Sequence, residues 1–166
     1  DSEITESTRY LLFESAVVNG TSIRLTSKKL GLRTEASSRY EKGLDVNNTI
    51  DVVNRAAQLV EELGAGEVAK GILDCYPEKV EPRLIKLECE RINALLGTDI
   101  SREEMIRIFR SLELEVDEAS DMIKVPTFRM DIEEMADLAE EVARFYGYNR
   151  ITPTLLHGKE TTRGIK

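Results

Sequence analysis

The chain has 166 residues, of which 41% are hydrophobic and 33% charged, and its net charge at pH 7 is −8. This composition predicts one or two small folded domains, and the absence of Trp predicts aliphatic cores. The negative balance argues against non-specific binding of nucleic acid by the chain as a whole, because phosphates would be repelled. No apolar run approaches the roughly 20 residues of a membrane-spanning helix, and no signal-peptide pattern opens the chain, so we expect a cytoplasmic protein without a membrane segment.

The first half of the chain combines bulky residues typical of strands with two helical patterns. RYLLFESAVV at 9–18 predicts a strand that ends at Asn19-Gly20. Thr21 is a candidate cap for a short helix that runs to Leu30, where Gly31 would end it. Apolar residues then recur at helical intervals from Val46 to Leu63, and VAKGILDCY at 68–76 predicts another strand. This half lacks the partner strands that would complete a sheet.

The second half begins after the two prolines at 77 and 82, which bracket a short linker. LIKLEC starts a compact unit, with a helix over 88–96 that Gly97 would end. Ser101 and Glu104 form a capping-box pattern before a helix whose apolar face runs to Leu112. Two strands at 114–119 and 122–128 form a predicted hairpin, turned at Ser120-Asp121, and an acidic helix follows from about residue 133. Helix, helix, hairpin and helix are the elements of a winged-helix-like module.

Several kinds of chemistry are excluded by residue counts. Cys75 and Cys89 are neither a CxxC pair nor a disulfide framework. His157 is the one histidine, which excludes His-rich zinc sites and Ser-His-Asp or Cys-His arrangements within this chain. No glycine-rich phosphate loop is present.

Two charged regions stand out. Residues 21–42 hold six basic and two acidic residues, a local balance of +4, which could face a phosphate backbone. An ordinary basic helix surface explains the same charges. The other region is the acidic helix, where Asp137, Glu140, Glu141 and Arg144 recur at i, i+3, i+4 and i+7 behind Asp131. Clustered carboxylates are candidate ligands for Mg²⁺ or Ca²⁺, whereas a solvated acidic face near a helix N-terminus is the alternative.

Two stretches resemble one known family. P-T-F-R-x-D-I-x-x-x-x-D-L-x-E-E-V-A-R-x-Y-G-Y, within residues 126–148, closely resembles the signature of the B5 domain of the bacterial phenylalanyl-tRNA synthetase beta subunit. GLRTEASSRYEKGLD at 31–45 resembles the end of the B3/B4 domain of the same subunit, and the two come in the family's order. The resemblance covers about residues 1–153. The start at Asp1, without an initiator Met, suggests a piece of something longer.

The resemblance implies an α+β fold with a partial B3/B4 α/β segment and a winged-helix-like B5 domain. The expected parts are residues 1–79 for the end of B3/B4, residues 80–152 for B5, and residues 153–166 for a connector tail. The parent enzyme is an aminoacyl-tRNA ligase that joins phenylalanine to tRNA(Phe) using ATP and Mg²⁺, as a heterotetramer with an alpha subunit. The synthetic active site lies in the alpha subunit, so the resemblance implies no residue here that is catalytic for aminoacylation.

The same resemblance implies two sites in this sequence. By motif and mutual spacing, Glu14, Thr34 and Ala36 match positions that line the B3/B4 pocket, where mischarged Tyr-tRNA(Phe) is hydrolysed. A carboxylate there would accept a hydrogen bond from the tyrosine hydroxyl, whereas phenylalanine would leave that acceptor unpaired. The acids that match the family's Mg²⁺ site in B5 are the following: Asp131, Asp137, Glu140 and Glu141.

Two other functions are consistent with the pattern. A winged-helix fold also occurs in non-catalytic nucleic-acid-binding proteins, although the carboxylates on the expected recognition surface would repel phosphate. The third possibility is a structural docking module.

Overall fold

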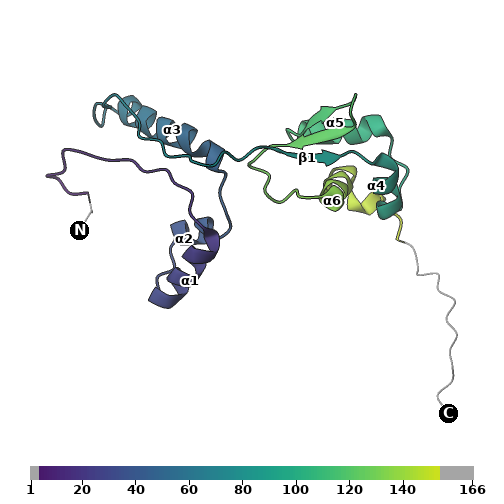
Figure 1. The fold of residues 1–166 in the computed structure, drawn as a ribbon, viewed down its shortest axis with the longest axis horizontal. Helices are drawn as coiled ribbons and strands as arrows, with labels where there is room; N and C mark the ends of the chain where they lie inside the picture. Colours follow the sequence, from purple (N-terminus) through teal and green to yellow (C-terminus); the bar gives the residue numbers. More distant parts are fainter. Residues whose placement is uncertain (1–3, 154–166) are drawn as a thin grey trace, which may run out of the picture. The chain divides into compact units, whose positions relative to one another are not determined.

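The computed structural model describes residues 4–153. In it the chain forms two compact units (Figure 1). The first unit holds the chain up to Arg83 together with the loop Pro126–Met130, and the second holds Leu84–Val125 and the chain from Asp131 on. Helices and one small sheet make up the regular structure, so the α+β prediction is confirmed. The predicted connector and His157 lie outside the described residues, except for Pro153. No helix in the described part is long and apolar enough to cross a bilayer.

The first unit is helical. Its elements are α1 (Gly20–Leu30), α2 (Glu35–Tyr40), the 3-10 turn η1 (Val46–Asn48) and α3 (Thr49–Glu62). Gly31 ends α1 at φ 65°, as predicted, because glycine adopts the left-handed conformation without a steric cost. The predicted Thr21 cap is wrong. The side chain of Asn19 accepts the Ser22 N–H at 2.9 Å instead, so α1 begins earlier than expected.

The two strands predicted in the first half are wrong. Residues 9–18 and 68–76 contain no strand in the structure. Both stretches have the bulky residues typical of strands, but a strand forms only where its N–H and C=O groups meet a neighbouring ladder. No such ladder exists among the described residues of the first unit.

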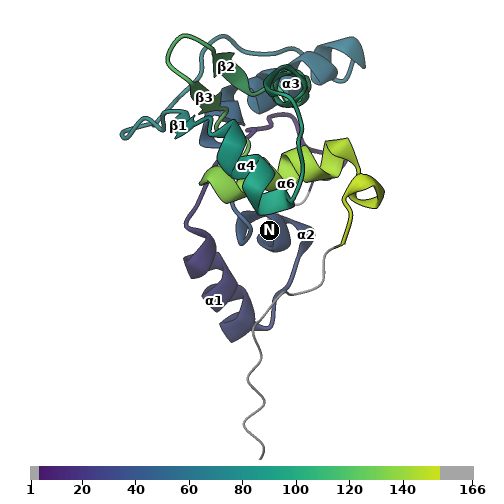
Figure 2. The same cartoon turned by 90° about the vertical axis from the view of Figure 1, so that its right-hand side faces the viewer.

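The second unit follows the predicted order of helix, helix, hairpin and helix. Its elements are β1 (Arg83–Lys86, of which all but Arg83 belong to this unit), α4 (Cys89–Leu96), α5 (Arg102–Ser111), β2 (Glu115–Asp117), β3 (Met122–Val125), α6 (Met135–Tyr146) and the 3-10 turn η2 (Tyr148–Arg150). The strands form one sheet in the order β1-β3-β2. β1 was not predicted as a strand, and it adds a third strand beside the hairpin. Helices α4 and α5 both pack against α6, and the turned view shows α4 crossing α6 (Figure 2).

The hairpin is fixed by its register and its turn. Strands β2 and β3 are antiparallel, with Val116 opposite Ile123, and Lys124 forms an ion pair with Glu115 at 2.9 Å. At the turn, the Asp117 carboxylate accepts the Ser120 hydroxyl at 2.5 Å and the Ala119 N–H at 3.0 Å. These two hydrogen bonds, that of Ser120 first, lower the pKa of Asp117 below its ordinary value.

Side-chain hydrogen bonds fix the connections between the helices. The Asn93 side chain donates to the Ile100 carbonyl at 2.9 Å and accepts the Ile100 N–H at 2.8 Å, so it closes the loop between α4 and α5. Ser101 caps α5 by accepting the Glu104 N–H, as predicted. The Glu104 carboxylate does not complete the expected capping box by accepting the Ser101 N–H. It binds the Arg107 guanidinium instead, at 2.5 and 2.8 Å.

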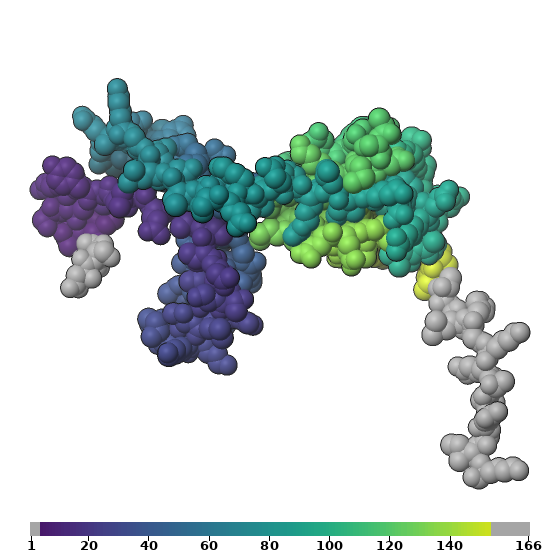
Figure 3. Space-filling model, in the orientation of Figure 1, coloured from purple at the N-terminus to yellow at the C-terminus, as the bar shows by residue number. Residues whose placement is uncertain are grey.

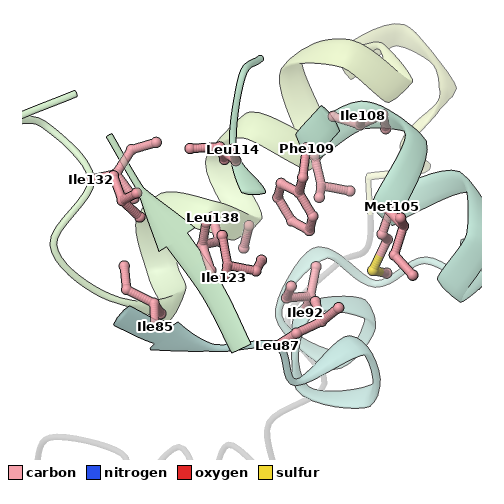
Figure 4. Close-up of a cluster of buried hydrophobic side chains, with 14 of the residues drawn as sticks. Ile85, Leu87, Ile92, Met105, Ile108, Phe109, Leu114, Ile123, Ile132 and Leu138 are labelled. Carbon is pink, nitrogen blue, oxygen red and sulfur yellow. The ribbon is translucent and has the colours of Figure 1, made fainter. Parts of the chain in front are cut away.

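Burial separates the two units sharply. All buried apolar side chains of residues 4–153 lie in the second unit, where they come from its sheet, its helices and the loops between them (Figure 4). Phe109 of α5 is fully buried among them. In the first unit Leu12 is 96% and Leu73 is 104% exposed, and α1, α2 and α3 contain no buried residue. The second unit therefore has a core of its own, whereas the described residues of the first unit do not.

The burial of the core predicts that truncating a buried aromatic ring costs more stability than truncating an exposed one. Phe109→Ala should destabilise the chain by about 3–5 kcal/mol, because it removes a fully buried ring and leaves a cavity. Phe145→Ala is the matched control, because that ring is 47% exposed and should cost about 1 kcal/mol or less. Urea unfolding followed by circular dichroism measures both. Equal losses for the two variants would contradict this core.

Candidate functional sites

The acidic helix begins with a carboxylate that binds its own backbone. Helix α6 starts at Met135, two residues after the predicted start. The Asp137 carboxylate accepts the N–H groups of Glu133 and Glu134, both at 2.8 Å. Those donors have no partner inside the helix, and a negative charge is favourable at this end. Asp137 therefore stabilises the start of α6.

The remaining acids of α6 do not form the single stripe that the sequence suggested. Glu141 is three positions after the core residue Leu138 and directly before the core residue Val142. Only 7% of the Glu141 surface is exposed. Its carboxylate forms an ion pair with Arg144. Glu140 is exposed. Because a helix turns by 100° per residue, Glu141 shares the apolar face with Leu138 and Val142.

An open polar hollow lies in front of α6, lined by four acids: Asp131, Glu133, Glu134 and Asp137. It joins two of the predicted metal ligands, Asp131 and Asp137, and leaves out Glu140 and Glu141. Glu133 and Glu134 were not predicted, although their position in the turn before a helix was a signal that could have found them. Within residues 4–153 no group of three or more Asp, Glu, Cys or His side chains is arranged to hold a metal ion.

The predicted editing residues lie in two places of the first unit. Thr34 caps α2, where its hydroxyl accepts the Ser37 N–H at 3.1 Å and the Ser37 hydroxyl accepts the Thr34 N–H at 2.9 Å. Ala36 is in the first turn of α2 and is exposed. Glu14 is exposed in an extended segment before α1, and its carboxylate has no hydrogen-bond or ion-pair partner within residues 4–153. The structure thus brings Thr34 and Ala36 together, and no described contact joins Glu14 to them.

A thiol in the second unit is protected by its surroundings. Burial raises the pKa of Cys89, and the nearby Arg102 guanidinium offsets part of that effect. Arg102 itself forms an ion pair with Asp121 at 2.5 Å, which links the start of α5 to the turn of the hairpin. Cys89 is therefore a partly buried free thiol at the edge of the core.

The cap of α6 can be tested without any ligand. Asp137→Ala should destabilise the chain by about 1 kcal/mol, because two N–H groups lose their acceptor. Asp137→Asn keeps an acceptor oxygen and should cost less. Glu140→Ala, three residues further along the same helix, is the control and should stay within about 0.5 kcal/mol of the parent chain. The measurement is the urea midpoint, and identical midpoints for Asp137→Ala and Glu140→Ala would show that Asp137 is not a cap.

Comparison with known proteins bears on both units. The family model described as the tRNA synthetase B5 domain matches residues 85–148, and the one described as the B3/4 domain matches residues 1–65. The chain is also similar to curated phenylalanine–tRNA ligase beta subunits. It is 47% identical to that of Clostridium acetobutylicum over 99% of this chain, 45% identical to that of Clostridium tetani over 99%, and 46% identical to that of Geobacter sulfurreducens over 93%.

These relatives are much longer than this chain. The chain spans 21%, 21% and 20% of their respective lengths. Both domain models match in the order that the two signature stretches predicted, and the identity extends over nearly all 166 residues. The chain belongs to the phenylalanine–tRNA ligase beta-subunit family, of which it spans a stretch from the B3/4 domain through the B5 domain.

Proposed function

We propose that the chain works as part of the beta subunit of an enzyme that attaches phenylalanine to tRNA(Phe) using ATP in the cytoplasm. The observation that supports this most is the 47% identity to the Clostridium acetobutylicum beta subunit over 99% of the chain. The partners in this proposal are tRNA(Phe) and an alpha subunit, which carries the synthetic active site in an alpha2beta2 tetramer. The domain limits proposed for this stretch are residues 1–79 for B3/B4, 80–152 for B5 and 153–166 for the connector.

The proposed role of the first unit is editing of mischarged Tyr-tRNA(Phe) through Glu14, Thr34 and Ala36. Glu14 suits the recognition of a phenol, because its exposed carboxylate has no acceptor role elsewhere within residues 4–153. Thr34 caps the start of α2, and this fixes the first helical turn, which carries Ala36. A site that hydrogen-bonds the tyrosine hydroxyl rejects phenylalanine, because the acceptor would be desolvated without a partner.

The editing proposal is tested in the assembled enzyme. Glu14→Ala should slow deacylation of Tyr-tRNA(Phe) by roughly 10–100-fold, as expected for the loss of a hydrogen bond to a charged acceptor. Pyrophosphate exchange with phenylalanine should not change, because aminoacylation takes place elsewhere. Glu6→Ala removes another exposed carboxylate of the same segment and is the control. Normal clearance of Tyr-tRNA(Phe) by Glu14→Ala would mean that Glu14 is a bystander.

Mg²⁺ binding by Asp131, Asp137, Glu140 and Glu141 is the second proposal of this kind. Mg²⁺ usually keeps several waters and takes one or two protein carboxylates, so the pair that lines the hollow, Asp131 and Asp137, is the smallest sufficient set. Glu141 would join only after leaving Arg144. In the assembled enzyme the ion would reduce the repulsion among these acids.

The test is the melting temperature of the assembled enzyme with and without millimolar Mg²⁺. Binding at about ten times the dissociation constant should stabilise by about 1.4 kcal/mol and raise the melting temperature by a few degrees. The double variant Asp137→Asn/Glu141→Gln should lose this response, whereas Glu90→Gln/Glu103→Gln, which removes two exposed carboxylates elsewhere, should keep it. If Asp137→Asn/Glu141→Gln keeps the wild-type rise in melting temperature with Mg²⁺, these acids are a solvated helix face and do not bind the ion.

The alternative nucleic-acid-binding function of the second unit is not favoured by its ion pairs. The helix before the hairpin would be the recognition helix of a winged-helix protein, and all its arginines are held by carboxylates. Arg102 binds Asp121 at 2.5 Å, Arg107 binds Glu104 at 2.5 Å and Arg110 binds Glu118 at 2.7 Å. Side chains engaged in this way neutralise fewer phosphates. A docking role of the B5 unit within the tetramer agrees better with this surface.

A further inference from the structure

Positive charge is concentrated in one helical hairpin, formed by α1, α2 and the residues around them. Residues 21–42 carry a balance of +4, and because the chain as a whole carries −8, the remaining residues carry −12. The six basic side chains are all exposed. They are Arg24, Lys28, Lys29, Arg33, Arg39 and Lys42. A basic surface in an acidic chain attracts anions locally even where the net charge repels them.

The cations of this hairpin also differ from those of the second unit in their partners. Within residues 4–153, five of the six have no ion-pair or hydrogen-bond partner for their charged groups, and only Arg33 is paired, with Glu41 at 3.2 Å. In the second unit, by contrast, the arginines of α4, α5 and α6 bind carboxylates. Arg24 and Lys28 are one turn apart, where like charges repel, so a bound anion would relieve a repulsion that the chain itself leaves in place.

Packing of α1 on α2 brings these cations onto one helical hairpin. The start of α1 lies so close to the end of α2 that a Cβ on Gly20 would stand 2.8 Å from the Glu41 carbonyl oxygen. α1 and α2 pack on each other and form a lobe of the first unit, drawn in purple and blue in the space-filling view (Figure 3). Thr21, Arg24 and Lys28 share one face of α1, at i, i+3 and i+7. Hydroxyls and cations together are the side chains that contact phosphate oxygens in nucleic-acid complexes.

The helix dipole does not explain the whole pattern. Lys28 and Lys29 lie in the last turn of α1, where a cation is favourable in any protein. Arg39 lies in the last turn of α2 and Lys42 directly follows its C-cap, so the same effect favours both. Arg24 lies in the middle of α1 and Arg33 precedes the N-cap of α2, where a cation gains nothing from the dipole. The positions of Arg24 and Arg33 therefore need another reason.

We propose that the α1–α2 hairpin is an RNA-docking surface, with Arg24 and Lys28 on the sugar–phosphate backbone of the tRNA. This inference rests on the proposed function, which brings a mischarged tRNA to the first unit. The hairpin neutralises phosphates, and its binding is weak and depends on salt, because the rest of the chain is acidic. It reads no base sequence, since its contacts are to the backbone.

The experiment is fluorescence anisotropy of a labelled tRNA(Phe) transcript with the 166-residue chain between 50 and 300 mM KCl, concentrations chosen to span roughly physiological ionic strength. Arg24→Gln/Lys28→Gln should weaken binding roughly tenfold or more at low salt and make the slope of log K against log salt shallower by about 1.5, which is the loss of two phosphate contacts. The control, Lys70→Gln/Lys86→Gln, makes the same change in net charge at exposed positions outside the hairpin and should leave the slope unchanged. Arg24→Lys/Lys28→Arg keeps the charges and should keep the binding, which separates a charge effect from a local loss of helix.

Three results would overturn the proposal. They are an equal loss in both double variants, a slope that does not change in Arg24→Gln/Lys28→Gln, and binding to anionic vesicles or a polyglutamate peptide that exceeds binding to the transcript. In the assembled enzyme, the same double variant should raise the KM for Tyr-tRNA(Phe) deacylation and leave kcat unchanged. If Glu14→Ala impairs editing while the hairpin variant keeps the parent slope, the docking surface fails and the editing proposal stands. The reverse pair of results rejects editing and retains the docking surface.

Discussion

Burial of the Phe109 ring and its aliphatic neighbours between one small sheet and three helices is the interaction on which the second unit depends. All buried apolar side chains of the described residues except Ala143 belong to this one cluster. Each buried Val, Leu, Ile, Phe or Met side chain of the cluster is worth about 1.5–3 kcal/mol when removed from water, so the cluster outweighs the exposed ion pairs, which contribute about 0–1 kcal/mol each. The surface charges can therefore vary with function while the core keeps the fold.

The same core determines what the acids of α6 can do. Leu138 and Val142 fix the rotation of the helix, and this rotation turns Glu141 inward and leaves Glu140 in water. At the start of the helix, the free backbone N–H groups engage Asp137. Three carboxylates that are close in sequence thus have three different environments: Asp137 caps the helix, Glu141 forms a buried ion pair, and Glu140 lies in solvent. Any ion bound near them has to compete with these existing contacts.

Local signals were sufficient to predict much of the second unit. Gly97 after α4, Ser101 before α5 and the turn between β2 and β3 each act through a few neighbouring residues, and the structure has all three in place. Strands needed more than local signals. The stretches 9–18 and 68–76 have the composition of strands but no ladder among the described residues, whereas β1 is short and gains its pairing only from β3. The acidic stripe was misjudged because charge spacing alone does not give the rotation of a helix, which the apolar residues set.

The central claim is that the second unit is held by its own core, while the described residues of the first unit are not. Amide hydrogen exchange of the 166-residue chain, resolved by residue, tests it most directly. The account predicts the slowest exchange at Phe109, Ile123 and Val142. It predicts much faster exchange throughout α3, because no side chain of α3 is buried. Protection of α3 equal to that of α5 would contradict the account, because it would require a core in the first unit that these residues do not form.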